Sequence, residues 1–118
     1  MAEKPIAWVG TSLSDLIAFP IDAKKEAGYQ LHRIQNGYLP EHFKPFKQVG
    51  AGVNEVRIME ANGIYRLMYV AKFQEAVYVL HAFEKKSQKT TKHDVDIAIR
   101  RYKSVVSSRS LMCKLRGK

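Results

Sequence analysis

VNEVRIMEANGIYRLMYVAKFQEAVYVLHAF, the stretch of residues 53–83, reads as three strands joined by short turns. We expect the strands over Val53–Glu60, Ile64–Phe73 and Ala76–Phe83, because apolar residues alternate along them and Asn62-Gly63 is a strong hairpin signal. Both faces of the second and third strands are largely apolar, which is typical of strands that are covered on each side. The stretch therefore predicts an antiparallel three-stranded meander packed between other elements.

The segment before the meander predicts a strand followed by a helical hairpin. Ile6–Val9 is a short β-branched and aromatic run, and the Thr-Ser pair after it can cap a short helix. Apolar residues then recur at helical spacing from Pro20 to Asn36-Gly37, which is a C-terminal cap signal. Residues 38–52, with two prolines and two glycines, read as a loop.

The segment after the meander predicts one more helix and a tail. Thr91, with Asp94 three residues later, is a capping pattern, and an apolar stripe follows as far as Val105. From residue 107 to 118 no period is sustained, so we expect a basic, frayed and flexible end there. The fold class is α+β, with one domain over residues 1–106 and a tail after it.

The charge of the chain is concentrated near its C-terminus. The chain has 118 residues and a formal net charge of +9, and from Glu84 onward eleven Lys and Arg face three acids. A basic surface on a neutral scaffold suits a polyanion, because neutralising phosphates releases counterions. A solvated tail, or a surface that docks on an acidic protein, is the alternative.

Composition also excludes several classes of protein. Cys113 is the single cysteine, so an intramolecular disulfide or a cysteine-only metal cage cannot form. No apolar run reaches the roughly 18 residues of a membrane span, and the N-terminus lacks the apolar core of a secretory signal. We therefore expect a cytoplasmic protein without a membrane partner.

Two arginines lie inside apolar strand sequence, which is unfavourable unless an anion compensates for lost hydration. Arg57 and Arg66 fall on adjacent strands, and the turn pairs position 57 with position 66 or 68. If the two guanidinium groups converge on one face, they form a fork that can hold a phosphate. The structural alternative is that Arg57 pairs with Glu55 and that Arg66 lies across the sheet edge.

A lysine cluster follows the last strand of the meander. Lys85, Lys86 and Lys89 crowd together before a helix start, where free backbone N–H groups also favour an anion. Crowding lowers the pKa of an ammonium, so one lysine can serve as a proton acceptor. The alternative is a cluster that contacts phosphate backbone or stays solvated.

Other chemistry-bearing residues give weaker patterns. Strict alternation places His81 on one face with Val79 and Phe83, which favours a buried core histidine over a proton-transfer role. The remaining histidines show no metal-site spacing, and the chain has no Gly-rich phosphate loop or serine elbow, so we expect neither metal nor cofactor. The candidate exposed aromatic residues for stacking on bases are Tyr38, Phe43 and Phe46.

With this order of elements the chain resembles the RelE/ParE toxin superfamily, and within it the phage-related, HigB-like branch. The resemblance covers roughly residues 6–102, and the segments that carry it are Pro5–Trp8, Ala51–Arg57, Tyr65–Val70 and His81–Thr90.

The resemblance implies a toxin of a type II toxin–antitoxin system that cuts mRNA on the ribosome without metal. Its catalytic residues would be Arg57, Arg66 and Lys86. The RNA-binding residues would be Lys85, Lys89 and Lys92, with His81 as the candidate for proton transfer. The implied partners are mRNA, the ribosome and an antitoxin of the helix-turn-helix kind.

Fold alone does not select this activity, because ParE-like members of the same superfamily inhibit DNA gyrase. A non-catalytic nucleic-acid-binding module is a further alternative, in which the basic patch serves only for positioning. The two strand arginines favour RNA cleavage.

Overall fold

The computed structural model describes residues 3–61, 63–85 and 89–115, which form an α+β fold. In chain order the elements are β1 (Ile6–Trp8), α1 (Ser12–Ile17), α2 (Ile21–Gln35), β2 (Phe43–Pro45), β3 (Val53–Glu60), β4 (Gly63–Val70), β5 (Val77–Lys85) and α3 (Lys92–Leu115). The predicted strands and helices are present, and the structure adds β2.

The strands form a single mixed sheet in the order β1-β5-β4-β3-β2. The predicted meander is confirmed, because β3, β4 and β5 pair antiparallel in sequence order. However, β1 joins the edge parallel to β5, and β2 pairs antiparallel with the outer edge of β3. The sheet is therefore larger than the predicted meander and is not purely antiparallel.

The prediction that residues 38–52 are all loop is wrong at β2. This strand has only three residues and ends in Pro45, so it is too short for alternation to reveal it. Its place is set by pairing: the backbone N–H of Arg57 donates to the carbonyl oxygen of His42 at 2.7 Å. Such an edge strand depends on a partner that is distant in sequence.

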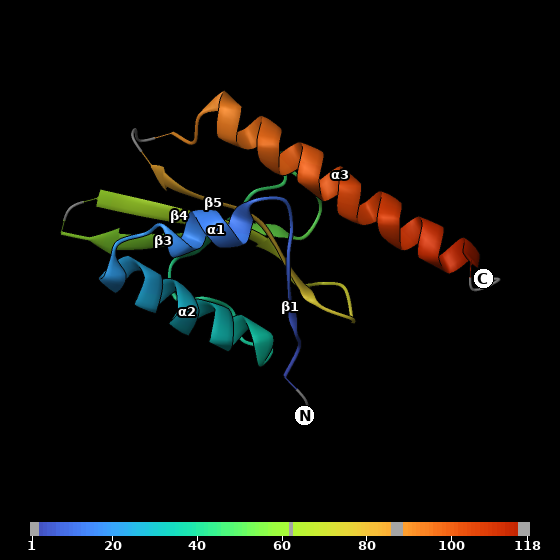
Figure 1. Ribbon diagram of the computed structural model, residues 1–118, viewed down its shortest axis with the longest axis horizontal. Coiled ribbons are helices and arrows are strands. Elements are labelled where there is room, and N and C mark those ends of the chain that lie inside the picture. Colours follow the sequence, from blue (N-terminus) through green and yellow to red (C-terminus); the bar gives the residue numbers. More distant parts are fainter. Residues whose placement is uncertain (1–2, 62, 86–88, 116–118) are drawn as a thin grey trace.

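Helices cover both faces of the sheet, as the two apolar faces of β4 and β5 predict. Figure 1 shows α2 below the sheet and α3 above it. One core lies between the sheet and the two N-terminal helices, and includes Leu31, Val56 and Leu67. The other lies beneath α3 and includes Met68 and Ala98. Side chains on the α3 side of the sheet also form the site described below.

A β-bulge changes the predicted faces of β5. Tyr69 pairs with Val79 but its neighbour Met68 pairs with His81, so Leu80 is an extra residue in the strand. Val79 therefore packs in the core under the N-terminal helices, whereas residue 81 lies on the α3 side. The prediction that Val79 and His81 share one face is wrong, because the bulge interrupts the two-residue period.

The predicted signals at the end of α2 and at the start of α3 are confirmed, whereas Thr11 before α1 makes no side-chain capping bond. Gly37 follows α2 with a φ of 89°, a conformation that glycine adopts without strain. The side chain of Thr91 accepts a hydrogen bond from the backbone N–H of Asp94 at 3.2 Å and donates one to its carboxylate at 2.8 Å. The predicted turn residue Asn62 lies outside the described residues.

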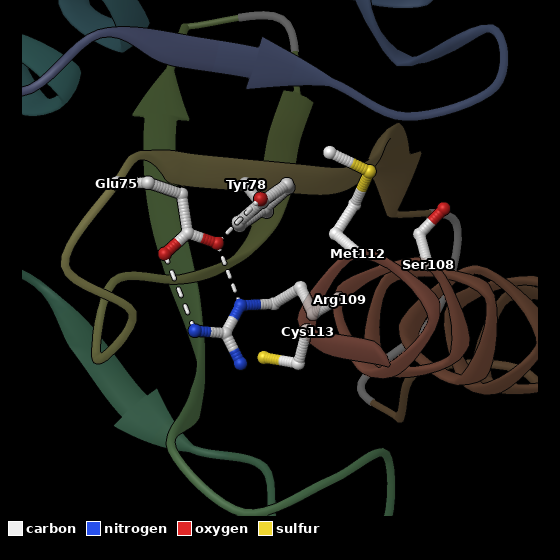
Figure 2. Close-up of a pocket in the computed structure, with 6 residues that line it drawn as sticks. All are labelled: Glu75, Tyr78, Ser108, Arg109, Met112 and Cys113. Atoms are coloured by element: carbon white, nitrogen blue, oxygen red, sulfur yellow. Dashed lines mark hydrogen bonds and ion pairs between the residues drawn. The ribbon is translucent and has the colours of Figure 1, made fainter. Parts of the chain in front are cut away.

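The last helix extends beyond its predicted end. Residues 107–115 are helical rather than frayed, so α3 runs through the predicted domain boundary at residue 106. Arg109 anchors this part, because its Nε donates to Glu75 at 2.6 Å (Figure 2). Its guanidinium also lies 3.9 Å from the centre of the Phe73 ring. An ion pair with a distant turn leaves no periodic signal in sequence. The flexibility of the tail stays a prediction.

Candidate functional site

Cationic side chains gather on the α3 side of the sheet, at the end of the β3–β4 hairpin. Arg57 and Arg66 are directly opposite each other across the two strands, so of the two predicted registers the one that pairs 57 with 66 is confirmed. Residue 66 in turn lies opposite Phe83 of β5, and Lys85 follows on the same face two residues later. The hairpin register thus brings three cations from three strands to one region.

Arg66 is buried and paired with a carboxylate. Its side chain is 3% exposed, that of Glu55 is fully buried, and the Arg66 Nη1 donates to Glu55 Oε1. Burial lowers the pKa of Arg66, and the charge of Glu55 partly offsets this effect. The alternative pairing of Glu55 with Arg57 is wrong, because residue 55 lies diagonal to residue 66, within reach of a long side chain.

Arg57 has the opposite environment, since it is exposed. It nevertheless lines the same cavity of about 140 Å³ as Arg66 and Glu55. The two guanidinium groups therefore meet at one cavity, but only that of Arg57 is exposed on the open side. The predicted fork of two arginines thus consists of the exposed Arg57 and of Arg66 in a buried ion pair with Glu55.

Phe43 and Lys44 of strand β2, with His42 just before it, complete this cavity. Sequence reasoning missed His42 and Lys44 as site residues because β2 was expected to be loop. Partial burial lowers the pKa of Lys85, and the charge of Arg66 lowers it further. Glu55 opposes this effect, while Lys44 and Arg57 make smaller contributions that also lower the pKa. Like charges in one place are unfavourable without an anion, so the cluster suits a phosphate group.

Of the remaining predicted lysines, two lie around this cluster and one lies outside the described residues. Lys86 is outside the described residues. Lys89 and Lys92 are exposed and line a larger neighbouring cavity of about 480 Å³, together with Lys44. The ammonium of Lys92 lies 3.6 Å from the Asp96 carboxylate in an exposed pair, which is worth little in water.

His81 is a core residue that lies apart from the lining of the cationic cavity. It is 5% exposed and stacks on Phe83, with 4.7 Å between ring centroids. Its Nε2 bonds the Asp94 carboxylate at 2.8 Å, and its buried Nδ1 has no partner within the described structure. Burial lowers its pKa, against the opposing effect of Asp94. The buried-histidine interpretation therefore fits this environment.

The start of α3 is tied to the site through the same buried carboxylate. The Thr90 hydroxyl donates to Glu55 Oε2 at 2.6 Å, so this side chain accepts bonds from both the sheet and the segment before α3. Sequence reasoning considered Glu55 only as a structural partner of Arg57. Its central place in this network has no local signal, since Thr90 is 35 residues away.

Other features of the described residues lie away from this cluster. A cavity of about 310 Å³ on the second half of α3 is lined by residues that include Glu75, Arg109 and Cys113 (Figure 2). The hydrogen bond from Arg109 lowers the pKa of Glu75 to about 2. In residues 3–61, 63–85 and 89–115, no three His, Cys, Asp or Glu side chains are placed to hold a metal ion. No helix of that part is long and apolar enough to cross a bilayer.

Comparison with known families identifies the chain. Residues 14–103 match the family described as "Phage derived protein Gp49-like (DUF891)", which is most of the sequence. The chain belongs to this Gp49-like family. The family indicates a phage-derived protein of the toxin type. The Gp49-like match ends within α3, so the last part of this helix is outside the matched region. A search of curated proteins found no match.

Proposed function

We propose that this Gp49-like protein is the toxin of a type II toxin–antitoxin system and cleaves mRNA on the ribosome in the cytoplasm. The chemistry is attack of a ribose 2′-hydroxyl on the adjacent phosphate, without metal. The observation that carries the proposal is the cavity where Lys44, Arg57 and Arg66 meet, with Lys85 beside it. Membership of a toxin-type family and the RelE/ParE resemblance support it.

The reaction needs charge stabilisation more than it needs a covalent partner. The 2′-oxygen forms a bond to phosphorus as the P–O5′ bond breaks, which gives a 2′,3′-cyclic phosphate and a 5′-hydroxyl. Negative charge grows on the non-bridging oxygens, and preorganised cations at that point lower the barrier. Arg57 holds the phosphate from its exposed position, and the buried Arg66 adds positive potential beneath it.

Two side chains are placed for the proton transfers. The 2′-hydroxyl must lose a proton and the departing O5′ must gain one. His42 lines the cavity, and the two ring nitrogens of an imidazole can accept and donate a proton. Lys85 has a lowered pKa beside the same cations. We assign proton transfer to His42 and Lys85 rather than to the buried His81.

The test is cleavage of mRNA by purified protein on translating ribosomes, with the new 5′ ends mapped. Arg57→Gln should lower the rate about 100-fold, the typical effect of losing one group that stabilises the transition state. Arg100→Gln, on the exposed face of α3, removes the same charge and should cleave like the wild type. Equal rates in the wild type and Arg57→Gln would refute the catalytic assignment.

A non-catalytic nucleic-acid-binding role is the second candidate, and one observation favours it. The charge of Arg66 is partly offset by Glu55, which leaves less cationic charge for a transition state than two unpaired arginines would supply. On this alternative the protein binds RNA or DNA without producing new ends, or inhibits gyrase as ParE-like proteins do. A DNA supercoiling assay on the same preparations separates gyrase inhibition from binding alone.

The proposal also requires an antitoxin, which we expect to be a small helix-turn-helix DNA-binding protein encoded next to the toxin gene. Expression of the toxin alone should arrest growth, and co-expression of the neighbouring open reading frame should restore it. Arrest that no neighbouring frame relieves would contradict this partner.

A further inference from the structure

A second, larger cavity opens next to the cationic one. Its volume is about 480 Å³, against about 140 Å³ for the cationic cavity, and Lys44 lines both. The two are also joined through Thr90, which lines the larger cavity and bonds Glu55 in the wall of the smaller one. A single ligand can therefore occupy both cavities, with one of its groups in each.

The lining of the larger cavity differs from that of the smaller one. Phe46 and the buried Val95 provide apolar surface, while Gln48 provides an amide and Asp96 a carboxylate. Lys44, Lys89 and Lys92 also line this cavity, so its lining combines cations, a carboxylate and apolar surface. Its size lies in the range of about 300–1,000 Å³ that is usual for small-molecule sites. An aromatic surface with a polar rim suits a flat base.

From these observations we propose that the larger cavity is a nucleobase subsite and that Asp96 selects guanine. The base stacks on the ring of Phe46, and its phosphate is held at the neighbouring cationic cavity. The ammonium of Lys44 now lies 5.6 Å from the centre of that ring and moves onto the phosphate when the base enters. This inference deepens the proposed function and rests on it for the placement of the phosphate.

The choice of guanine follows from the donors of each base. A carboxylate only accepts hydrogen bonds, and guanine presents two adjacent donors, N1–H and the N2 amino group, on one edge. Uracil presents its single N–H between two carbonyl oxygens, which a carboxylate repels. Asp96 is available because its exposed pair with Lys92, at 3.6 Å, is weak. Gln48 can donate to the guanine O6.

The test measures binding rather than cleavage, so that it does not depend on catalysis. The probes are short 2′-O-methyl oligouridines, which cannot be cleaved, with one central position changed to guanosine, adenosine or cytidine. Dissociation constants are measured by fluorescence anisotropy at one fixed salt concentration, because RNA affinity depends on salt. The wild type should bind the guanosine probe about tenfold more tightly than the all-uridine probe, the usual discrimination of a bidentate contact.

Variants separate base recognition from general effects of charge and folding. Asp96→Asn should weaken binding of the guanosine probe and leave the uridine probe bound as tightly or more tightly, since a negative charge is lost. Asp22→Asn makes the same charge change on α2, on the side of the sheet opposite α3 (Figure 1), and should keep the preference. Phe46→Leu should weaken all probes about tenfold through lost stacking, whereas Phe46→Tyr should bind like the wild type.

The outcomes distinguish this inference from the proposed function. Equal affinity of the wild type for guanosine and uridine probes overturns the guanine subsite, as does an Asp96→Asn effect that is the same for both. Undiminished binding by Phe46→Leu, with its fold verified by circular dichroism, overturns the stacking site. Absence of cleavage on ribosomes, with the base preference intact, overturns the nuclease and leaves the subsite standing. Failure to bind any probe overturns the subsite, and the ribosome assay then decides the nuclease separately.

Discussion

Replacing Glu55 by glutamine tests whether the buried ion pair stabilises the fold. The carboxylate accepts a bond from Arg66 at one oxygen and a bond from Thr90, at 2.6 Å, at the other. A hydrogen bond to a charged group contributes about 1.5–3 kcal/mol, and a neutral one about 0.5–1.5 kcal/mol. The amide keeps one acceptor but loses the charge and the second acceptor, and Arg66 Nε already has no partner in the described structure.

We therefore expect Glu55→Gln to lower the free energy of unfolding by about 3 kcal/mol, at the low end of the range for breaking a buried pair. Urea unfolding followed by circular dichroism measures this change. With a slope of about 1–3 kcal/mol per M, the midpoint should fall by roughly 1–3 M.

A double-mutant cycle supplies the control for this prediction. Arg66→Met alone leaves Glu55 buried without its cation, so it should also destabilise the protein. The double variant, Glu55→Gln with Arg66→Met, removes both charges and should cost less than the sum of the two single changes. A loss below about 1 kcal/mol in Glu55→Gln, or strict additivity in the cycle, would refute the view that this pair is buried and coupled.

Two further predictions concern the other side-chain networks. Since burial lowers the pKa of His81 below the value of about 6.5 in the unfolded chain, the unfolded state binds the proton more readily. Stability present above pH 6.5 should therefore be lost as the pH falls through the lowered pKa, by up to about 1.4 kcal/mol per pH unit. In urea titrations at several pH values, His81→Gln should make the free energy of unfolding depend less on pH. The same dependence on pH in the wild type and the variant would contradict this prediction. Arg109→Met should reduce hydrogen-exchange protection over residues 106–115 but not over the sheet, whereas Lys103→Met should change neither; unchanged protection in Arg109→Met would exclude the Glu75 anchor.

Local signals in the sequence were sufficient for most secondary structure. The bounds of β3 were predicted to the residue, because Val56 and Ile58 alternate with charged residues and a turn signal follows Glu60. The cap of α3 at Thr91 was also found, since a cap depends on residues three positions apart. Both features are set by short-range geometry, which a local pattern records directly.

Structural features that depend on a partner distant in sequence were not predicted, or were predicted only in part. The bulge at Leu80 and the edge strand β2 are defined by pairing with other strands. The continuation of α3 past residue 106 depends on an ion pair and a ring contact between Arg109 and the β4–β5 connection. None of these features produces a periodic pattern of apolar residues in the local sequence.

The sequence by itself determined that arginines lie on adjacent strands of a basic α+β protein, because strand alternation and composition are properties of the chain alone. Only the tertiary structure decided how those charges are used. The diagonal geometry of the hairpin joins Glu55 to Arg66, and pairing of β2 brings His42 and Lys44 to Arg57. Whether a charge is buried with a counter-ion or left exposed depends on which distant side chains pack around it, and that is settled only when the sheet assembles.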